Sequence, residues 1–164
     1  RLDPRLMVTA ADLINGLPEK GLYDIFKEYG EEPGAYRFAK FACRARLLKP
    51  IKSTADLLLA LELNGLNNRG RIHPATKVFQ ALRIAVNGEL ENLKIVLPIV
   101  ASKLAKGGRL VVISFHSLED RIVKNFGKSE LSLKEVNAVV SASLLEINSN
   151  PRSRSAKMRV YEKI

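Results

Sequence analysis

The segment 107–124, GGRLVVISFHSLEDRIVK, places a cluster of polar side chains directly after an apolar run. The cluster consists of His116, Ser117, Glu119, Asp120 and Arg121. These residue types supply hydrogen-bond acceptors, an imidazole and a guanidinium. An enzyme uses such groups to hold a polar substrate and to stabilise charge that develops on it. We therefore regard His116 and Asp120 as candidate catalytic residues, and His116, Ser117 and Arg121 as candidates for binding the substrate.

Each member of this cluster also has a structural alternative. His116 could make a hydrogen bond that closes the turn between a strand and a helix. Ser117 with Asp120, three residues later, matches a capping box and would then begin the helix. Asp120 and Arg121 could form a local ion pair, and no residue nearby in the sequence would tune Asp120 as a general base.

A second set of polar residues is predicted to share one face of a helix. His73, Lys77, Gln80, Arg83 and Asn87 are three or four residues apart, opposite an apolar stripe. Gln and Asn are unusual choices for solubility alone, so we expect this face to line a substrate cleft or to brace the sheet. The alternatives are a solvated helix face and, for His73, a helix cap before Pro74.

A third set is basic and lies near the end of the sequence. Arg152, Arg154 and Lys157 alternate with serines and precede Arg159. Arginine matches phosphate oxygens well, which favours contact with RNA. The alternative is an edge strand whose charges discourage aggregation. The two histidines lack a matching cysteine or carboxylate pattern, so we predict no metal site.

The elements that must position these residues divide the chain in two. Residues 1–72 are predicted to form a small helical unit, with a Gly- and Asn-rich boundary at 63–73. Residues 73–164 follow the order helix, glycine turn, strand, polar cluster, helix, and their last ten are predicted to be an edge strand. The unbroken apolar run in 109–115 is typical of a strand covered on both faces, as in a parallel sheet. Ligands of such α/β sheets bind outside the carboxyl ends of the strands, where the polar cluster lies.

The composition favours an anionic partner. The 164 residues carry a net charge of +10, and residues 101–164 hold twelve basic against six acidic side chains. RNA, DNA and an anionic membrane surface are the candidates. The lone Cys43 excludes an internal disulfide and suits a reducing compartment such as the cytoplasm. No apolar run approaches the length of a membrane span, and no pattern sets an oligomeric state.

Four stretches of the chain together resemble one family of enzymes. They are residues 73–90 (HPATKVFQALRIAVNGEL), 107–124, 150–159 (NPRSRSAKMR) and the opening stretch 1–32. They resemble the small-subunit ribosomal RNA methyltransferase H family, which methylates N4 of a cytosine in the decoding region of 16S rRNA. The resemblance covers nearly the whole chain, except residues 125–146 and the loop 63–72.

The resemblance implies a partial Rossmann-like class I methyltransferase domain (residues 73–164) with a helical substrate-recognition domain (residues 1–72) inserted into it. The implied partner is 16S rRNA in the small ribosomal subunit. The family's S-adenosylmethionine site is built from motifs upstream of a segment like RLDPRL, where this chain begins. We therefore expect no cofactor-binding residues in this chain, and no activity from it alone. The alternatives are a non-catalytic basic RNA-binding module and, more weakly, a basic assembly protein.

Overall fold

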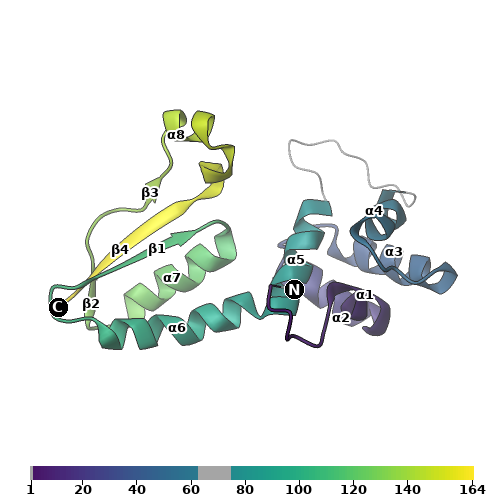
Figure 1. Ribbon diagram of the computed structural model, residues 1–164, viewed down its shortest axis with the longest axis horizontal. Helices are drawn as coiled ribbons and strands as arrows, with labels where there is room; N and C mark the ends of the chain where they lie inside the picture. Colours follow the sequence, from purple (N-terminus) through teal and green to yellow (C-terminus); the bar gives the residue numbers. More distant parts are fainter. Residues whose placement is uncertain (1, 63–74) are drawn as a thin grey trace. The chain divides into compact units, whose positions relative to one another are not determined.

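The computed structural model describes residues 2–62 and 75–164, and it divides the chain into two compact units. Unit 1 is Arg1–Glu89 and unit 2 is Leu90–Ile164. The first is helical and the second combines helices with a sheet (Figure 1). Among the described residues, no helix combines the length and the apolar character needed to cross a membrane.

Two helices of unit 1 begin at side-chain hydrogen-bond caps. Its helices are α1 (Ala10–Gly16), α2 (Glu19–Glu28), α3 (Ala35–Leu48), α4 (Thr54–Glu62) and α5 (Ala75–Asn87). The Thr9 hydroxyl accepts a hydrogen bond from the Asp12 amide, and the Asp12 carboxylate accepts one from the Thr9 amide. Ser53 and Asp56 exchange the same pair of bonds before α4. Both pairs are therefore capping boxes.

The core of unit 1 is formed by apolar faces of these helices at helical spacing. Its fully buried side chains include Leu22 and Phe26 of α2, Phe38 of α3, Leu57 and Leu61 of α4, and Val78 and Leu82 of α5. Cys43 is half-buried against this core. Helix α5, which the sequence groups with residues 73–164, packs here against α1 and α2.

Unit 2 contains a four-stranded sheet with helices. Its elements are α6 (Glu89–Lys103), β1 (Arg109–Ser114), α7 (Ser117–Ser129), β2 (Leu133–Glu135), β3 (Val140–Ser141), α8 (Leu144–Ser149), the 3₁₀ helix η1 (Pro151–Ser155) and β4 (Lys157–Lys163). Gly88, with φ +60°, separates α5 from α6. Pro98 lies inside α6.

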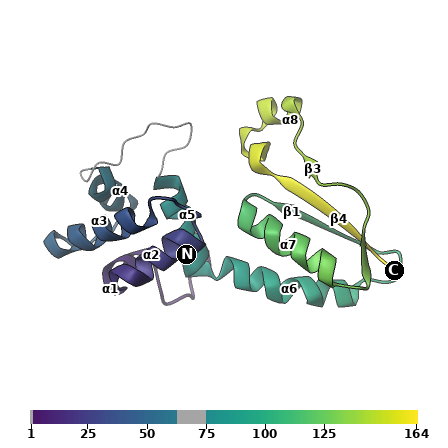
Figure 2. The ribbon, with the colours of Figure 1, turned by 180° about the vertical axis from the view of Figure 1, so that it is seen from behind.

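The sheet is antiparallel throughout, and β4 is its central strand (Figure 2). β1 pairs with one edge of β4, while β2 and β3 pair with the other edge. The prediction of an edge strand at 155–164 is therefore wrong. The physical reason is that β4 alternates buried Arg159 and Tyr161 with half-buried apolar residues, a pattern that suits the middle of a sheet.

The prediction of a strand covered on both faces is also wrong for the described residues. Leu110 and Ser114 of β1 are buried, whereas Val111 and Ile113 are 53% and 54% exposed. In the β1–β4 register, Val111 lies opposite Val160 and Ile113 opposite Met158, so these four residues share the second face. This set, Val111, Ile113, Met158 and Val160, is called the open sheet face below. Its apolar character explains why the sequence predicts a buried strand.

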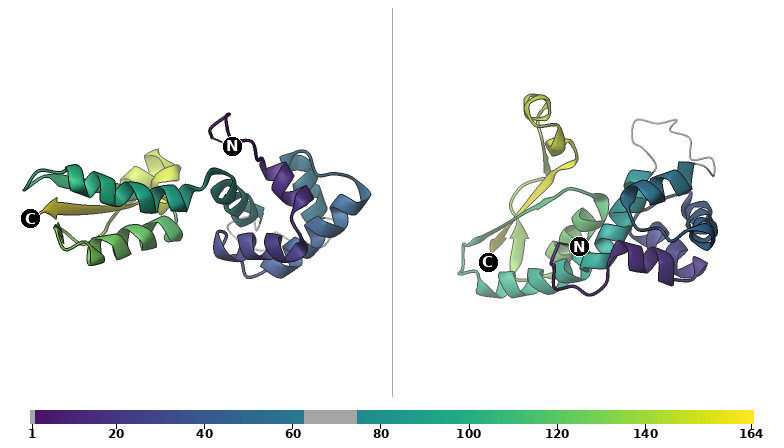
Figure 3. Two further views of the ribbon diagram at one scale, coloured as in Figure 1. Left: turned by 90° about the horizontal axis from the view of Figure 1, so that it is seen from below. Right: turned by 45° about the vertical axis from the view of Figure 1, so that its right-hand side comes forward.

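Helices α6 and α7 contribute to the core on the other face of the sheet, which carries Leu110 and Tyr161 (Figure 3). That core combines Leu97 and Ala101 of α6 with Leu110, Val123 and Tyr161. The Tyr161 hydroxyl donates a hydrogen bond of 3.2 Å to the Val123 carbonyl. Gly127, one helical turn further along α7, faces the Tyr161 ring so closely that a Cβ there would lie 2.1 Å from a ring carbon. The contact fixes α7 on β4, and with it the polar cluster at the start of α7.

Candidate functional site

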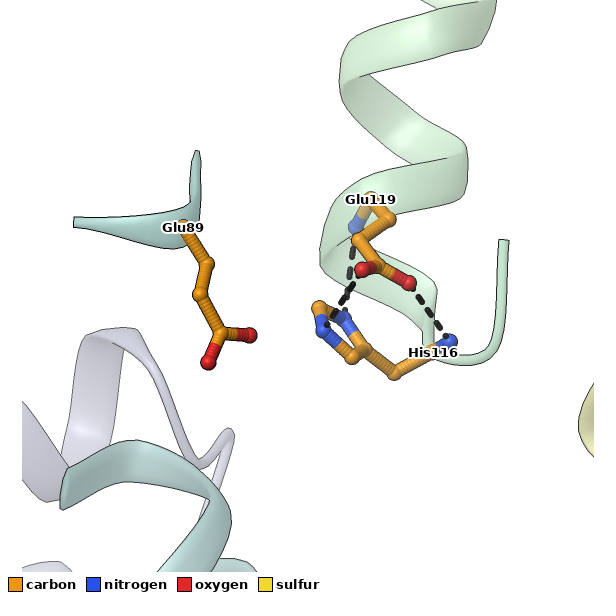
Figure 4. A group of neighbouring side chains, drawn as sticks. All are labelled: Glu89, His116 and Glu119. Atoms are coloured by element: carbon orange, nitrogen blue, oxygen red, sulfur yellow. Dashed lines mark hydrogen bonds and ion pairs between the residues drawn. The ribbon is translucent and has the colours of Figure 1, made fainter. Parts of the chain in front are cut away.

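The turn that links β1 to α7 is closed by His116 and Glu119. The His116 Nδ1 accepts a hydrogen bond of 3.3 Å from the Glu119 amide, and Glu119 Oε2 accepts one from the His116 amide (Figure 4). Glu119 Oε2 also accepts from the Phe115 amide. The His116 Nε2 lies 3.5 Å from Glu119 Oε1. His116 is thus the N-cap of α7, which is the structural alternative considered for it. Glu89, also drawn in Figure 4, belongs to unit 1.

The predicted capping box of Ser117 and Asp120 is wrong by one residue. Ser117 is exposed and is the first residue of α7 rather than its cap. An imidazole nitrogen can accept the capping hydrogen bond as a hydroxyl does, so His116 and Glu119 satisfy the amides that Ser117 and Asp120 were expected to satisfy. This arrangement leaves the Asp120 side chain available for another contact.

Asp120 makes a buried ion pair with Arg159 of β4. Arg159 Nε lies 2.7 Å from Asp120 Oδ1, and Nη2 lies 3.3 Å from Oδ2. Both side chains are about one-tenth exposed. Arg159 Nη1 also donates to Glu135 Oε1 at 3.0 Å, and Lys157 Nζ lies 3.5 Å from Asp120 Oδ2. Asp120 therefore joins the helix to the sheet, over a sequence separation of 39 residues.

Charge balance in this cluster holds Asp120 in its ionised form. The hydrogen bonds from Arg159 lower the pKa of Asp120 below its usual value, although burial acts in the opposite direction. The same contact raises the pKa of Arg159. A carboxylate whose pKa is lowered is a weak base, so this geometry favours a positioning role for Asp120 over proton abstraction.

The predicted basic residues of unit 2 occupy two different environments. Lys157 is half-exposed and faces the Asp120 carboxylate, whereas Arg152 and Arg154 are exposed on η1. Arg121 is exposed on α7. The structure thus brings together His116, Ser117, Asp120, Arg121 and Lys157 around the start of α7 and β4. Their role in binding RNA stays a prediction.

The predicted polar face of α5 lies in unit 1 and makes contacts within that unit. Lys77 Nζ donates to the Glu31 carbonyl at 3.0 Å. Arg83 makes a bidentate ion pair with Glu89, in which Nε lies 2.8 Å from Oε1 and Nη2 lies 2.9 Å from Oε2. Asn87 accepts from the Leu2 amide at 2.6 Å and donates to the Arg83 carbonyl. Gln80 is half-buried on the same helix, and His73 lies outside the described residues.

Arg159 and Glu119 make contacts that the sequence did not predict. Arg159, which follows the basic run in the sequence, pairs with Asp120, and nothing local marks this pairing because the two residues are 39 positions apart. Glu119 is the second half of the capping box. The spacing of three residues between His116 and Glu119 is a signal that could have found it, had histidine been considered as a cap.

The glycine pair Gly107–Gly108 does not build a nucleotide-binding loop. Such a loop follows a strand and opens a helix, with its amides directed at the phosphates. Here the pair follows α6 and leads into β1. The Gly107 amide donates to the Lys163 carbonyl at 2.7 Å, so it extends the β1–β4 pairing. These residues do not fit the S-adenosylmethionine site of a methyltransferase.

Comparison with known proteins assigns the chain to a family. The profile of the "MraW methylase family" matches residues 1–164, which is the full length of the chain. The chain belongs to the MraW methylase family. The resemblance found in the sequence is thereby confirmed, and the mixed α/β structure of unit 2 is consistent with a methyltransferase-like fold.

Curated relatives of this MraW family chain carry the name ribosomal RNA small subunit methyltransferase H. The protein from Coprothermobacter proteolyticus is 53% identical over 160 residues, which are 95% of this chain and 53% of the relative. One from Dehalococcoides mccartyi is 46% identical over 183 residues, covering all of the chain and 52% of the relative. The protein from Geobacter sp. (strain M21) is 44% identical over 185 residues, which cover all of this chain and 59% of the relative. The chain spans about half the length of the curated relatives that it matches.

Proposed function

We propose that this chain is the C-terminal part of an S-adenosylmethionine-dependent enzyme that methylates N4 of a cytosine in the decoding region of 16S rRNA. The observation that carries the proposal is the family match over residues 1–164, together with relatives named as small-subunit rRNA methyltransferases. The site of action is then the small ribosomal subunit in the cytoplasm. The helical part, predicted as residues 1–72, would recognise the substrate.

The chemistry of the proposed reaction sets what the chain's residues must do. The cytosine amine is a weak nucleophile because its lone pair is delocalised into the ring. The protein must therefore extrude the base, hold it still and accept hydrogen bonds from its amine. Because His116 and Asp120 are engaged by Glu119 and Arg159, we assign them the task of fixing the β1–α7 turn. The exposed cations Arg121, Arg152 and Arg154 are then suited to hold the RNA backbone.

The proposal also requires a further segment that completes the sheet and carries the cofactor site. Two observations support this. The open sheet face exposes Val111 and Ile113 to solvent, although strands that face solvent usually carry polar residues there. β1 is an edge strand with one side unpaired among the described residues. A longer protein with a covering layer and a neighbouring strand would satisfy both.

Methyl transfer measured on two forms of the protein tests this proposal. The longer enzyme is incubated with unmethylated small ribosomal subunits and S-adenosylmethionine, and the digested rRNA is examined by nucleoside mass spectrometry. We expect N4-methylcytidine from the longer enzyme and none from residues 1–164 alone. Methylation of another base or atom, or transfer by the 164-residue chain alone, would contradict the proposal.

The second candidate function is a non-catalytic RNA-binding module, which the net charge of +10 favours. It predicts RNA affinity that falls with salt, with a log–log slope of about −0.7 for each phosphate contacted on a single strand. A longer protein that binds rRNA with this slope but transfers no methyl group would favour the module over the enzyme.

A further inference from the structure

Unit 1 carries a group of aromatic and basic side chains on α2 and α3, in which Tyr23 packs against the core and Tyr36 is exposed. Tyr23 of α2 and Tyr36 of α3 meet edge to face, with ring centroids 6.4 Å apart. Lys27 Nζ lies 5.3 Å from the Tyr23 ring centroid, and Lys40 Nζ lies 5.9 Å from that of Tyr36. We call these four residues the tyrosine–lysine patch.

The exposure of Tyr36 separates this patch from an ordinary core contact. Tyr36 is 59% exposed, whereas the nearby aromatic side chains of Phe26 and Phe38 are fully buried in the core. Burial of an aromatic ring is strongly favourable, so a ring left open to solvent beside the Lys40 ammonium has surface to offer a ligand. The patch borders a hollow of about 500 Å³, lined also by Glu31, Glu32 and Pro33.

The loop beneath this hollow is held in an unusual conformation. Glu31 has φ +45°, in the left-handed region that residues other than glycine rarely adopt. The Lys77 ammonium donates to its carbonyl at 3.0 Å, and Glu32 Oε1 accepts from the Gly34 amide at 2.9 Å. The loop that starts α3, and therefore Tyr36, is fixed by contacts on both sides. A rigid platform loses little entropy when a ligand stacks on it.

The charge around Tyr36 is unequal on its two sides. Helix α3 (AYRFAKFACRARLL) contains four cations and no acidic residue. Arg46 is committed to the carbonyls of Ile14 and Leu17, while Arg37 and Arg44 are exposed. On the other side of Tyr36 lie the carboxylates Glu31 and Glu32. A polyanion is thus favoured along α3 and disfavoured over the loop.

We infer that the tyrosine–lysine patch binds single-stranded RNA, with one base stacked on the exposed Tyr36 ring and its phosphate on the side of Lys40. Aromatic rings flanked by cations are the elements that proteins use to bind unpaired nucleotides. The inference rests on the proposed function only for its choice of RNA as the ligand. It adds a substrate contact in the helical unit, on residues outside the predicted site.

Binding of a fluorescent single-stranded RNA oligonucleotide to the full 164-residue chain tests the inference. Fluorescence anisotropy is measured at several salt concentrations for the natural chain and for Y36A, Y36F and K40A. Loss of a stacked base weakens binding by roughly 5- to 150-fold, so we expect an effect in this range for Y36A and little effect for Y36F. Lys106→Ala, which removes an exposed charge in unit 2, is the matched control for K40A.

The salt dependence separates stacking from charge. K40A should weaken binding and reduce the log–log salt slope by about 0.7, whereas Y36A should leave the slope unchanged. Circular dichroism should show that Y36A folds, since the Tyr36 side chain is exposed in the natural chain. The inference is overturned by equal affinity of Y36A and the natural chain, by equal losses from K40A and Lys106→Ala, or by absence of RNA binding.

This binding result is independent of the methyl-transfer result. If Y36A loses affinity while the longer enzyme methylates another base, the stacking inference stands and the proposed function fails. If the longer enzyme makes N4-methylcytidine while Y36A binds RNA normally, the proposed function stands and the stacking inference fails.

Discussion

Arg159 donates hydrogen bonds to both oxygens of the Asp120 carboxylate, at 2.7 and 3.3 Å, and both side chains are about one-tenth exposed. The pair joins the first turn of α7 to the centre of β4. Removal of one partner from a buried pair leaves the other charge unpaired, which is costly.

Asp120→Ala is expected to destabilise the chain by ~3–5 kcal/mol, because Arg159 is left buried without its main partner. Lys124→Ala, an exposed charge on the same helix, is the control and should change stability by less than about 0.5 kcal/mol. Urea unfolding followed by circular dichroism measures both. A loss for Asp120→Ala no larger than that of the control would show that Glu135 and solvent satisfy Arg159.

The same pair predicts a pH dependence. The pKa of Asp120 is lowered in the folded chain from its usual 3.8, so its ionised form is stabilised by folding. This contribution is fully present above pH 3.8 and is lost as the pH falls through the folded pKa. The difference in unfolding free energy between the natural chain and D120N should therefore shrink as the pH falls below 3.8. A difference that is constant over this range would exclude the linkage.

Capping of α7 by His116 predicts a contrast between adjacent residues. H116A should cost ~1 kcal/mol, because the Glu119 amide loses its acceptor, while H116S should retain most of the stability. S117A should have almost no effect, since Ser117 is not the cap. Thermal unfolding of the three variants provides the measurement. The reverse order, with S117A the more damaging, would restore the capping box that the sequence suggests.

Close packing of Gly127 on Tyr161 predicts that this glycine tolerates no side chain. A Cβ at Gly127 would lie 2.1–2.6 Å from three atoms of the Tyr161 side chain, so G127A should destabilise by roughly 1–3 kcal/mol through overpacking. G16A is the matched control, because a Cβ at this helical position in α1 has nothing within 4 Å. It should be neutral or slightly stabilising. Similar losses from both variants would argue against the packing explanation.

The sequence predicts those features that depend on neighbouring residues. The start of β1 directly after the glycine turn is confirmed, because it is determined within a few positions. The β1–α7 turn shows where this approach fails. Two overlapping patterns, His116 with Glu119 and Ser117 with Asp120, have the same spacing, and the remote Arg159 decides between them by engaging Asp120.

The sheet itself depends on contacts that local patterns do not contain. The apolar run in β1 is the same whether its neighbour is parallel or antiparallel, and the antiparallel pairing with β4 joins residues about fifty positions apart. The second face of the strand is apolar, as expected for a covered strand, yet Val111 and Ile113 are exposed in this chain. The sequence thus predicts the chemistry of the face correctly and its environment incorrectly.

The open sheet face provides the last prediction. V111T/I113T makes this face more polar at side chains that are more than half exposed, so it should leave the unfolding free energy of the 164-residue chain within about 0.5 kcal/mol. In the longer enzyme, where we propose that a further layer covers these residues, the same change should destabilise by ~2–4 kcal/mol, because each buried hydroxyl would need a partner. The comparison uses chemical unfolding of both forms. Equal effects in the two forms would mean that the face stays exposed in the longer enzyme, contrary to the proposed covering layer.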